Sequence, residues 1–477
     1  MAFSRAGDTG ALSSVGCVTD TGGDGRPGTD GFCVNGDALL GASALAVSPD
    51  GRHVYVTSHT SNGIAWFARD AATGALAQSG CIKEFPRADR CRAGFGVERT
   101  SGVAVSADGK HVYVTAANPG AVSAFSRDPD SGDLEPIMCV SENGSDGLCT
   151  DGTALTGASS VTIAPDGSQV FVTAAAIGGV TAYARDAATG RLTPQSCLLD
   201  RAPRGGSCRT APALAGAAAS AISPDGKTLF VASAADEALA LFARDAATGA
   251  LTPSSCFVHR VPKDAEDVDE EASEDEEAED AAAGDCTPAM AIGRAREVVV
   301  SPDGRGVFVL GDENYLATFG RDTGSGQLTQ TGCAEGEVTY KACSRARGLF
   351  DARGMAVSSD ARSLYVANQS AHAVSVLGAN VAVASRAAAA DRRGRFRVRL
   401  ACPAARVRGC AGGLRVGAAK TRAYRVRAGA SRAVRARLPK RLRRVVRKRG
   451  RVSVKVAARD SRRLMAPSVR RVVVRRR

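Results

Sequence analysis

Ser48-Pro49-Asp50-Gly51, followed by His53-Val54-Tyr55-Val56-Thr57, is the stretch that decides the fold, because it returns along most of the chain. Proline fixes φ at about −65° at one central turn position, aspartate tolerates the next, and glycine adopts the left-handed conformation that closes the turn. The flanking residues alternate with a period of two, which predicts a β-hairpin. The equivalent turns are Ser106–Gly109, Ala164–Gly167, Ser223–Gly226, Ser301–Gly304 and the degenerate Ser358–Ala361.

The repeat around this turn is about 58 residues long and contains four predicted strands. Two strands flank the turn, a third ends near Phe67 and Arg69, and a fourth ends at Cys81. Four antiparallel strands per repeat predict an all-β fold, a β-propeller, and not a helical solenoid. The aromatic residue of the third strand recurs, with a cysteine 14 residues beyond each copy, at Phe3, Phe67, Phe125, Tyr183, Phe242 and Phe319.

The number of predicted strands sets the expected number of blades. Two N-terminal strands, four in each of five complete repeats, and three after Ser358 give 25, whereas six blades need 24. We therefore expect a six-bladed β-propeller of four-stranded antiparallel blades, in which the strand Ala11–Val18 completes the last blade and Met1–Arg5 is redundant. Seven blades, with material missing upstream, is the alternative.

All fourteen cysteines fall into sequence-adjacent pairs. A zinc site would favour CxxC clusters with histidine nearby, and only His259 lies close to a cysteine, Cys256. We therefore expect a disulfide in each loop between blades, which would contribute about 2 to 4 kcal/mol. The expected pairs are Cys17 and Cys33, Cys81 and Cys91, Cys139 and Cys149, Cys197 and Cys208, Cys256 and Cys286, Cys333 and Cys343, and Cys402 and Cys410.

The predicted disulfides require an oxidising compartment. The chain shows neither a signal peptide nor an apolar stretch long enough to span a membrane. We give more weight to the cysteines and expect a secreted or cell-surface protein whose start codon has been assigned too far downstream.

Charge separates a C-terminal module from the propeller. Residues 386–477 carry 33 Lys and Arg against two acids, whereas the rest of the chain is acidic. The expected domains are a propeller over 1–380, a linker over 381–394 that includes the alanine-rich stretch, and a small basic β-sandwich over 395–477. Alternation around Phe396 and Val452 predicts strands with one buried and one cationic face.

This basic module suggests a polyanionic partner. With Phe396 and Tyr424 as its only aromatic residues, it lacks a stacking platform, which argues against nucleic acid. The alternatives are a solvated cationic face or attachment to an anionic envelope polymer or lipid surface.

A strongly acidic segment lies within the propeller repeats. Residues 264–280 contain twelve carboxylates, and this composition predicts a disordered acidic insertion.

The repeats, with Ser-Pro-Asp-Gly before Val54-Tyr55-Val56-Thr57 and the related Tyr365-Val366-Ala367-Asn368, resemble the YVTN-type β-propeller family. Its enzymatic relatives are lactonase-like propellers, including 6-phosphogluconolactonase and muconate cycloisomerase-type proteins. The resemblance covers about residues 1–380 and implies the fold. Enzymes of this group resemble one another in a His- and Arg-bearing segment before the innermost strand, and the matching positions here contain no histidine. The basic tail resembles Arg-rich β-sandwich modules of secreted actinobacterial proteins.

Function is expected on the loops that vary between blades, because the turns are nearly identical. His53 and His111 share a second-strand position and are interpreted as structural residues of the repeat and not as a metal pair. The residues expected to contact a small anionic ligand or a protein at the central mouth are Arg99, Arg294, Arg296, Glu297, Asp351 and Arg353. Further polar groups expected near the mouth are Glu98, His59, Asp236, Glu237, Asp312, Glu313 and His372.

Two functions remain open at this point. The first is a non-catalytic ligand-binding or interaction scaffold, secreted or held at the cell surface, with no cofactor. The alternative is a lactonase-type hydrolase acting on a small anionic lactone, in which carboxylates at the mouth would hold a divalent metal. Arg296 and Arg353 occupy equivalent positions in successive repeats, so we expect both to bind an anionic group.

Overall fold

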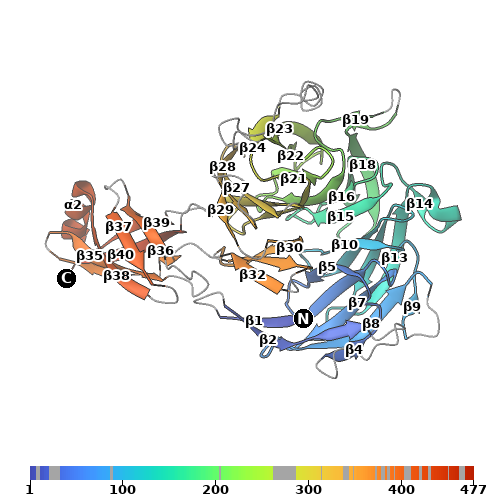
Figure 1. The fold of residues 1–477 in the computed structure, drawn as a ribbon, viewed down its shortest axis with the longest axis horizontal. Helices are drawn as coiled ribbons and strands as arrows, with labels where there is room; N and C mark the ends of the chain where they lie inside the picture. Colours follow the sequence, from blue (N-terminus) through green and yellow to red (C-terminus); the bar gives the residue numbers. More distant parts are fainter. Residues whose placement is uncertain are drawn as a thin grey trace, which may run out of the picture. The chain divides into compact units, whose positions relative to one another are not determined.

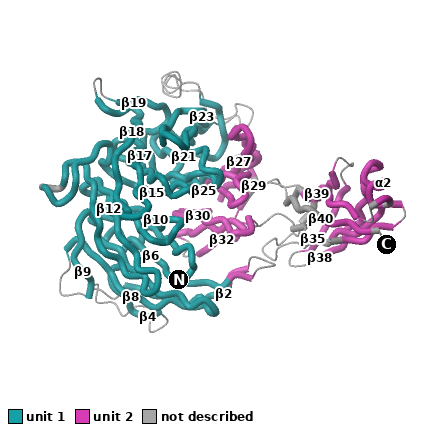
Figure 2. Tube along the Cα trace, turned by 180° about the vertical axis from the view of Figure 1, so that it is seen from behind, with its two compact units in different colours: residues 1–4, 13–298, 309–313 teal, residues 5–12, 299–308, 314–477 magenta. Residues whose placement is uncertain are grey.

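The structure is a computed structural model of the 477-residue chain (Figure 1). It describes residues 1–6, 11–20, 33–85, 90–202, 206–260, 286–312, 314–336, 343–346, 349–361, 363–370, 373–377, 382–383, 387–391, 393–401, 410–417, 422–427, 431–449, 451–460 and 468–476. The acidic run 264–280 lies outside these residues. The chain divides into two compact units (Figure 2), unit 1 with residues 1–4, 13–298 and 309–313, and unit 2 with residues 5–12, 299–308 and 314–477.

Unit 1 contains four five-stranded sheets in which neighbouring strands follow one another in sequence. Their strands are β5 (Ala42–Val47), β6 (His53–Ser58), β7 (Gly63–Arg69), β8 (Leu76–Lys83) and β9 (Arg92–Ala93); β10 (Thr100–Val105), β11 (His111–Ala116), β12 (Ala121–Arg127), β13 (Leu134–Ser141) and β14 (Thr150–Asp151); β15 (Ala158–Ile163), β16 (Gln169–Ala174), β17 (Gly179–Arg185), β18 (Leu192–Leu199) and β19 (Arg209–Thr210); and β20 (Ala217–Ile222), β21 (Thr228–Ser233), β22 (Ala238–Arg244), β23 (Leu251–His259) and β24 (Thr287–Ala289). A short 3₁₀ helix, η2 (Gly144–Gly147), precedes β14.

The remaining propeller-type sheets are one of five strands, one of three and two of two strands. They are β25 (Ala295–Val300), β26 (Gly306–Gly311), β27 (Tyr315–Arg321), β28 (Leu328–Glu335) and β29 (Ser344–Arg345); β30 (Ala352–Val357), β31 (Leu364–Asn368) and β32 (Ala373–Leu377); β1 (Ala2–Arg5) and β2 (Leu12–Gly16); and β3 (Val18–Asp20) and β4 (Val34–Gly36). The all-β propeller prediction is confirmed.

The core lies between consecutive blades. In one cluster, Tyr55 and Trp66 of the first complete blade pack with Val112, Val114 and Phe125 of the next. All five side chains are almost inaccessible to solvent, so the second and third strands of each blade are apolar on both faces. This burial on both faces explains why the sequences of these strands are nearly continuous apolar runs. In the fourth strands, by contrast, more and less exposed residues alternate.

Each complete blade has a fifth strand that our sequence analysis did not predict. The strand β9 pairs in parallel with the end of β8, and β14, β19, β24 and β29 do the same in their blades. A disulfide holds this added strand beside the fourth strand, as between Cys81 and Cys91. The six disulfides in the described residues join Cys17 and Cys33, Cys81 and Cys91, Cys139 and Cys149, Cys197 and Cys208, Cys256 and Cys286, and Cys333 and Cys343, as expected.

A buried arginine at the end of the third strand connects three of the blades to the one before them, through Arg127, Arg185 and Arg244. The Arg185 side chain, 1% exposed, donates from Nη2 to Asp108 Oδ2 at 2.8 Å and from Nε to Tyr113 Oη at 3.0 Å. Its Nη1 donates to Gly167 O at 3.0 Å, and His111 Nδ1 lies 2.6 Å from Nη2. Arg127 makes the same contacts with Asp50, Tyr55, Gly109 and His53.

We call this arrangement the interblade arginine clamp: a third-strand arginine, the aspartate of the preceding blade's turn, and the polar residues of that blade's second strand. Burial, together with the charge of Arg185, lowers the pKa of His111, so the imidazole stays neutral beside the guanidinium. The structural interpretation of His53 and His111 is therefore confirmed.

The same clamp corrects the blade count. Arg5 of β1 donates from Nε to Tyr365 Oη at 2.8 Å and from Nη2 to the Asp360 carboxylate at 3.0 Å. These are the contacts that a third strand makes with the preceding blade, so β1 belongs to the blade that follows β30-β31-β32. The expectation that Ala11–Val18 completes the last blade is wrong, because β2 pairs with β1 in a separate sheet. The sheets therefore represent seven blades, the alternative count, of which the first and last lack strands among the described residues.

The C-terminal module is a two-sheet β-sandwich. One sheet has the order β33 (Ala382–Val383), β35 (Arg395–Ala401), β38 (Ser431–Arg437), and the other has the order β34 (Ala387–Ala390), β40 (Ser468–Arg476), β39 (Arg451–Asp460), β36 (Cys410–Val416), β37 (Arg422–Val426). The helix α2 (Lys440–Arg449) follows β38. Phe396 and Val398 of the first sheet share one buried cluster with Val456 and Val472 of the second.

Two expectations for this module need comment. The alanine-rich stretch expected to be a linker contains β33 and β34. These strands pair with β35 and β40, respectively. The small methyl side chains fit the sandwich, and Ala390 is buried in it. The disulfide between Cys402 and Cys410 stays a prediction, since Cys402 lies outside the described residues.

Removing the carboxylate of one clamp should destabilise the propeller. Asp108→Ala leaves the buried Arg185 without its counter-ion, and we expect a loss of about 2 to 4 kcal/mol because Asp108 itself is partly exposed. Asp186→Ala removes an exposed turn aspartate and is the matched control. Urea unfolding measures both, and equal effects of the two substitutions would contradict the importance of the clamp.

Candidate functional site

In three blades a serine near the start of the innermost strand connects it to the next blade. Ser43 Oγ donates to Thr100 O at 2.9 Å, Ser101 Oγ to Ala158 O at 2.7 Å, and Ser159 Oγ to Ala217 O at 2.7 Å. The small side chain is suited to this contact because it reaches a neighbouring backbone without filling the space between the strands. At the equivalent positions of β25 and β30 the chain has Arg296 and Arg353.

The exchange of serine for arginine in β25 creates a charged cluster. Arg296 Nη1 lies 2.5 Å from Asp312 Oδ1, and Arg294 Nε lies 3.9 Å from Asp312 Oδ2. The backbone holds this arrangement, because the amide of Asp312, just after β26, donates to Arg294 O at 3.3 Å. We call Arg294, Arg296, Glu297 and Asp312 the β25 polar cluster. All four residues lie in unit 1.

Glu297 is the titratable group of the cluster with the most perturbed pKa. Burial raises the pKa of its carboxyl from 4.5 to about 7, and the nearby charge of Arg296 opposes this rise without cancelling it. By accessible surface Glu297 is half-buried, and it lies between the buried residues Ala295 and Val298 of the same strand, which are 0% and 2% exposed. A carboxyl with this pKa exchanges a proton near neutral pH, as a general acid or base must.

The residues just before the innermost strands adopt the left-handed backbone conformation. Glycine occupies this position at Gly41, Gly157 and Gly216, with φ of 69°, 74° and 69°. The equivalent residues Arg99, Arg294 and Asp351 have φ of 53°, 46° and 50°. A side chain in this region costs about 1 to 3 kcal/mol, and such strain concentrates at functional sites.

The other predicted site residues form separate groups. Arg99 Nε donates to His59 Nε2 at 3.0 Å, so this arginine, just before β10, is paired with the residue that follows β6 of the preceding blade. Arg353 Nη2 lies 2.6 Å from Asp351 Oδ1, and Ser370 Oγ donates to Asp351 Oδ2 at 2.5 Å. The hydrogen bond from Ser370, with the charge of Arg353, lowers the pKa of Asp351. That Arg99, Asp351 and Arg353 bind a ligand stays a prediction, and Glu313 and His372 lie outside the described residues.

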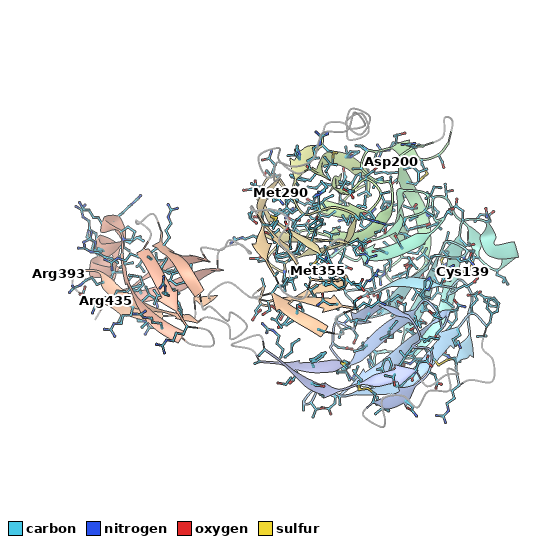
Figure 3. The ribbon with its side chains drawn as sticks, viewed as in Figure 1. Cys139, Asp200, Met290, Met355, Arg393 and Arg435 are labelled. Carbon is cyan, nitrogen blue, oxygen red and sulfur yellow. A yellow bond between two sulfur atoms is a disulfide. The ribbon has the colours of Figure 1, made fainter. Side chains whose placement is uncertain are left out.

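Asp236 has a structural role that our sequence analysis missed. Its Oδ2 accepts a hydrogen bond from the amide of Ala215 at 2.8 Å, beside Asp200, which accepts from the amide of Leu214 at 3.3 Å (Asp200 is labelled in Figure 3). Burial and the neighbouring Asp200 raise the pKa of Asp236. Asp20, Glu84 and Glu142 are the counterparts of Asp200 in other blades, so a carboxylate that recurs at the end of the fourth strand was the signal for this loop cap, to which Asp236 adds from the loop after β21.

Two classes of feature are not found in the part of the chain that the structure describes. No group of three or more His, Cys, Asp or Glu side chains there could hold a metal ion. No helix there combines the length and apolar character that crossing a membrane requires.

Comparison with known proteins places these features in context. The family model described as lactonase, 7-bladed beta-propeller, matches residues 7–138 and 103–262. The periplasmic gluconolactonase of Pseudomonas aeruginosa is 18% identical, with 92% of this chain and 94% of that chain covered and a TM-score of 0.51. A putative 6-phosphogluconolactonase from Bacteroides uniformis is 19% identical, with coverages of 71% and 81% and a TM-score of 0.47. No curated protein is significantly similar in sequence.

The raised pKa of Glu297 should make the free energy of unfolding depend on pH. Because its folded pKa of about 7 lies above the ordinary value of 4.5, the folded state binds more protons, and stability falls as pH rises through this interval. Glutamine does not titrate, so the free energy of unfolding of Glu297→Gln should lack this fall. The difference in unfolding free energy, variant minus parent, should therefore increase by about 1 to 3 kcal/mol between pH 5 and pH 8. Urea unfolding at both pH values gives this difference, and an unchanged difference would contradict the raised pKa.

Proposed function

Because the chain belongs to the lactonase, seven-bladed β-propeller family, we propose that it is a lactone hydrolase that works at the β25 polar cluster. The observation that carries this proposal is the Glu297 carboxyl, which has a pKa near neutrality beside Arg296. Of the two functions that the sequence leaves open, the family favours the hydrolase over the non-catalytic scaffold. The gluconolactonase from Pseudomonas aeruginosa, similar in fold, suggests sugar lactones as first substrates.

Hydrolysis of a lactone needs a base, a stabiliser of negative charge and an acid. In the proposed reaction, ionised Glu297 takes a proton from water as the water oxygen attacks the ring carbonyl carbon. The carbonyl oxygen becomes an oxyanion, whose charge the guanidinium groups of Arg294 and Arg296 stabilise. The ring C–O bond then breaks, and the leaving oxygen takes the proton back from Glu297 to give the hydroxy acid.

Asp312 positions the arginines for this role. Its carboxylate lies 2.5 Å from Arg296 Nη1 and holds that side chain, which is 24% exposed, in one orientation. Arg294 is more weakly held and 61% exposed, so it is free to follow an anionic substituent of the substrate. When Glu297 is ionised, Glu297 and Asp312 balance the two cations, so an anionic group of the substrate would contact Arg294, the more exposed of the two arginines.

Replacing Glu297 tests the proposal directly. Glu297→Gln should lower kcat for lactone hydrolysis by at least about 100-fold, because it removes the general base. In the parent, kcat/KM should rise with pH through about 7 as Glu297 ionises. A pH-indicator assay on five- and six-membered lactones, with and without an anionic group, measures both after subtraction of the spontaneous rate.

The matched control is Glu98→Gln, which removes a partly exposed carboxylate that immediately precedes an equivalent arginine, Arg99. It should change kcat less than 2-fold. Equal activity of Glu297→Gln and the parent would refute the assignment of Glu297. A parent that binds a lactone without hydrolysing it would restore the binding-scaffold interpretation.

We also propose that the protein is secreted or held at the cell surface, because six disulfides need an oxidising compartment. Non-reducing peptide mapping of protein produced by export should recover these six bridges and a seventh between Cys402 and Cys410. Free thiols at most of these positions in exported protein would argue against this location.

A further inference from the structure

One face of the C-terminal module carries arginines directly opposite one another. In the antiparallel pair of β35 and β38, Arg395 faces Arg437, and Arg397 faces Arg435. Residues that face each other across such a pair lie on the same side of the sheet. All four arginines are exposed, whereas the alternate residue Phe396 is 4% exposed and packs into the sandwich core. We call these four residues the arginine array.

The array is a concentrated positive charge that the module does not neutralise. Neighbouring side chains lie about 5 Å apart across the strands and about 7 Å apart along them, and like charges in these positions destabilise a sheet. Among the described residues, the carboxylate paired with the array is Asp391, 2.7 Å from Arg395 Nε. Residues 386–477 contain one other acid, Asp460 in β39 of the second sheet. An anionic ligand would relieve the remaining repulsion.

More cations extend the array at one edge. The amide of Leu438, which follows β38, donates to Gly394 O at 2.9 Å, and Arg437 Nε donates to Arg393 O at 3.4 Å. These bonds hold Arg393 next to the array, and both Arg393 and Arg435 project from the module in Figure 3. A ligand with several anionic groups in a row therefore fits this face better than a single small anion.

The chemistry of the side chains narrows the choice of polymer. Arginine forms a planar fork that binds phosphate oxygens through two parallel hydrogen bonds. A single-stranded nucleic acid would also need exposed aromatic side chains, but Phe396 and Tyr424 of this module are 4% and 6% exposed. We propose that the arginine array binds a linear phosphodiester polymer without bases, of the poly(glycerol phosphate) type, through successive phosphates.

The test uses the full-length protein and fluorescently labelled poly(glycerol phosphate), with binding followed by anisotropy at several salt concentrations. Four phosphate contacts predict a slope of log K against log[salt] of about −3. Arg397→Gln with Arg435→Gln should weaken binding at low salt at least 10-fold and reduce the slope by about 1.4. Arg397→Lys with Arg435→Lys, which keeps the charge but not the fork, should give an intermediate loss.

The matched control is Arg415→Gln with Arg425→Gln, which removes the same charge from exposed positions on the second sheet. It should weaken binding less than 3-fold, and circular dichroism confirms that each variant folds. If both Gln pairs weaken binding equally, the affinity reflects net charge and the array is not the site. If a poly(dT) strand of equal phosphate number binds 10-fold more tightly, the partner is nucleic acid and the proposal is overturned.

Discussion

The buried guanidinium at the end of the third strand, found in Arg127, Arg185 and Arg244, is the constraint on which the packing of these blades depends. With 1% of its side chain exposed, Arg185 has lost its water and needs protein acceptors for its N–H groups. They come from the preceding blade: a turn aspartate, a second-strand tyrosine and a histidine. Because an unpaired buried charge is strongly destabilising, a blade can pack only when the preceding turn is in register. The Ser-Pro-Asp-Gly turn is therefore an assembly element as well as a hairpin.

This constraint acts at one end of the innermost strand and leaves the other end free to change. In β25 the turn follows Val300, whereas Arg294, Arg296 and Glu297 lie where the strand begins. At that beginning the serine contacts of Ser43, Ser101 and Ser159 are repeated but not essential, since Ala218 lacks one in β20. Larger charged groups can therefore replace the serine, as Arg296 does in β25 and Arg353 in β30.

The sequence supports prediction of features that arise from local chemistry. The turns, the four antiparallel strands and six cysteine pairs follow from residue type and spacing, because each depends on neighbours close in the chain. The blade count needed the long-range contact of Arg5 with Asp360, which spacing alone does not reveal. The parallel fifth strand was missed because strands of two residues, such as β9, carry no periodicity.

The candidate site was predictable in composition but not in electrostatics. The unusual residues at the start of β25 stand out against the serine and alanine of other blades, so their positions were expected to matter. The pKa of Glu297 depends on how completely its surroundings exclude water, which only tertiary packing determines. Asp236 shows that a position near the mouth is not enough to predict a role in ligand binding. Its carboxylate instead accepts a hydrogen bond from the backbone amide of Ala215.

The raised pKa of Glu297 persists because its strand cannot move to relieve it. Ala295, two residues before Glu297, and Val298, directly after it, are fully buried, and Arg294 O accepts a hydrogen bond from the amide of Asp312 after β26. Glu297 is half-buried, and a shift of β25 that exposed more of it would break this bond and uncover two core side chains. The partial desolvation of the Glu297 carboxyl is thus maintained by the same packing of Ala295 and Val298 that stabilises the blade. In the reaction that we propose, a carboxyl held in this way would need no further reorganisation before it transfers a proton, which is an advantage over the same carboxyl in water.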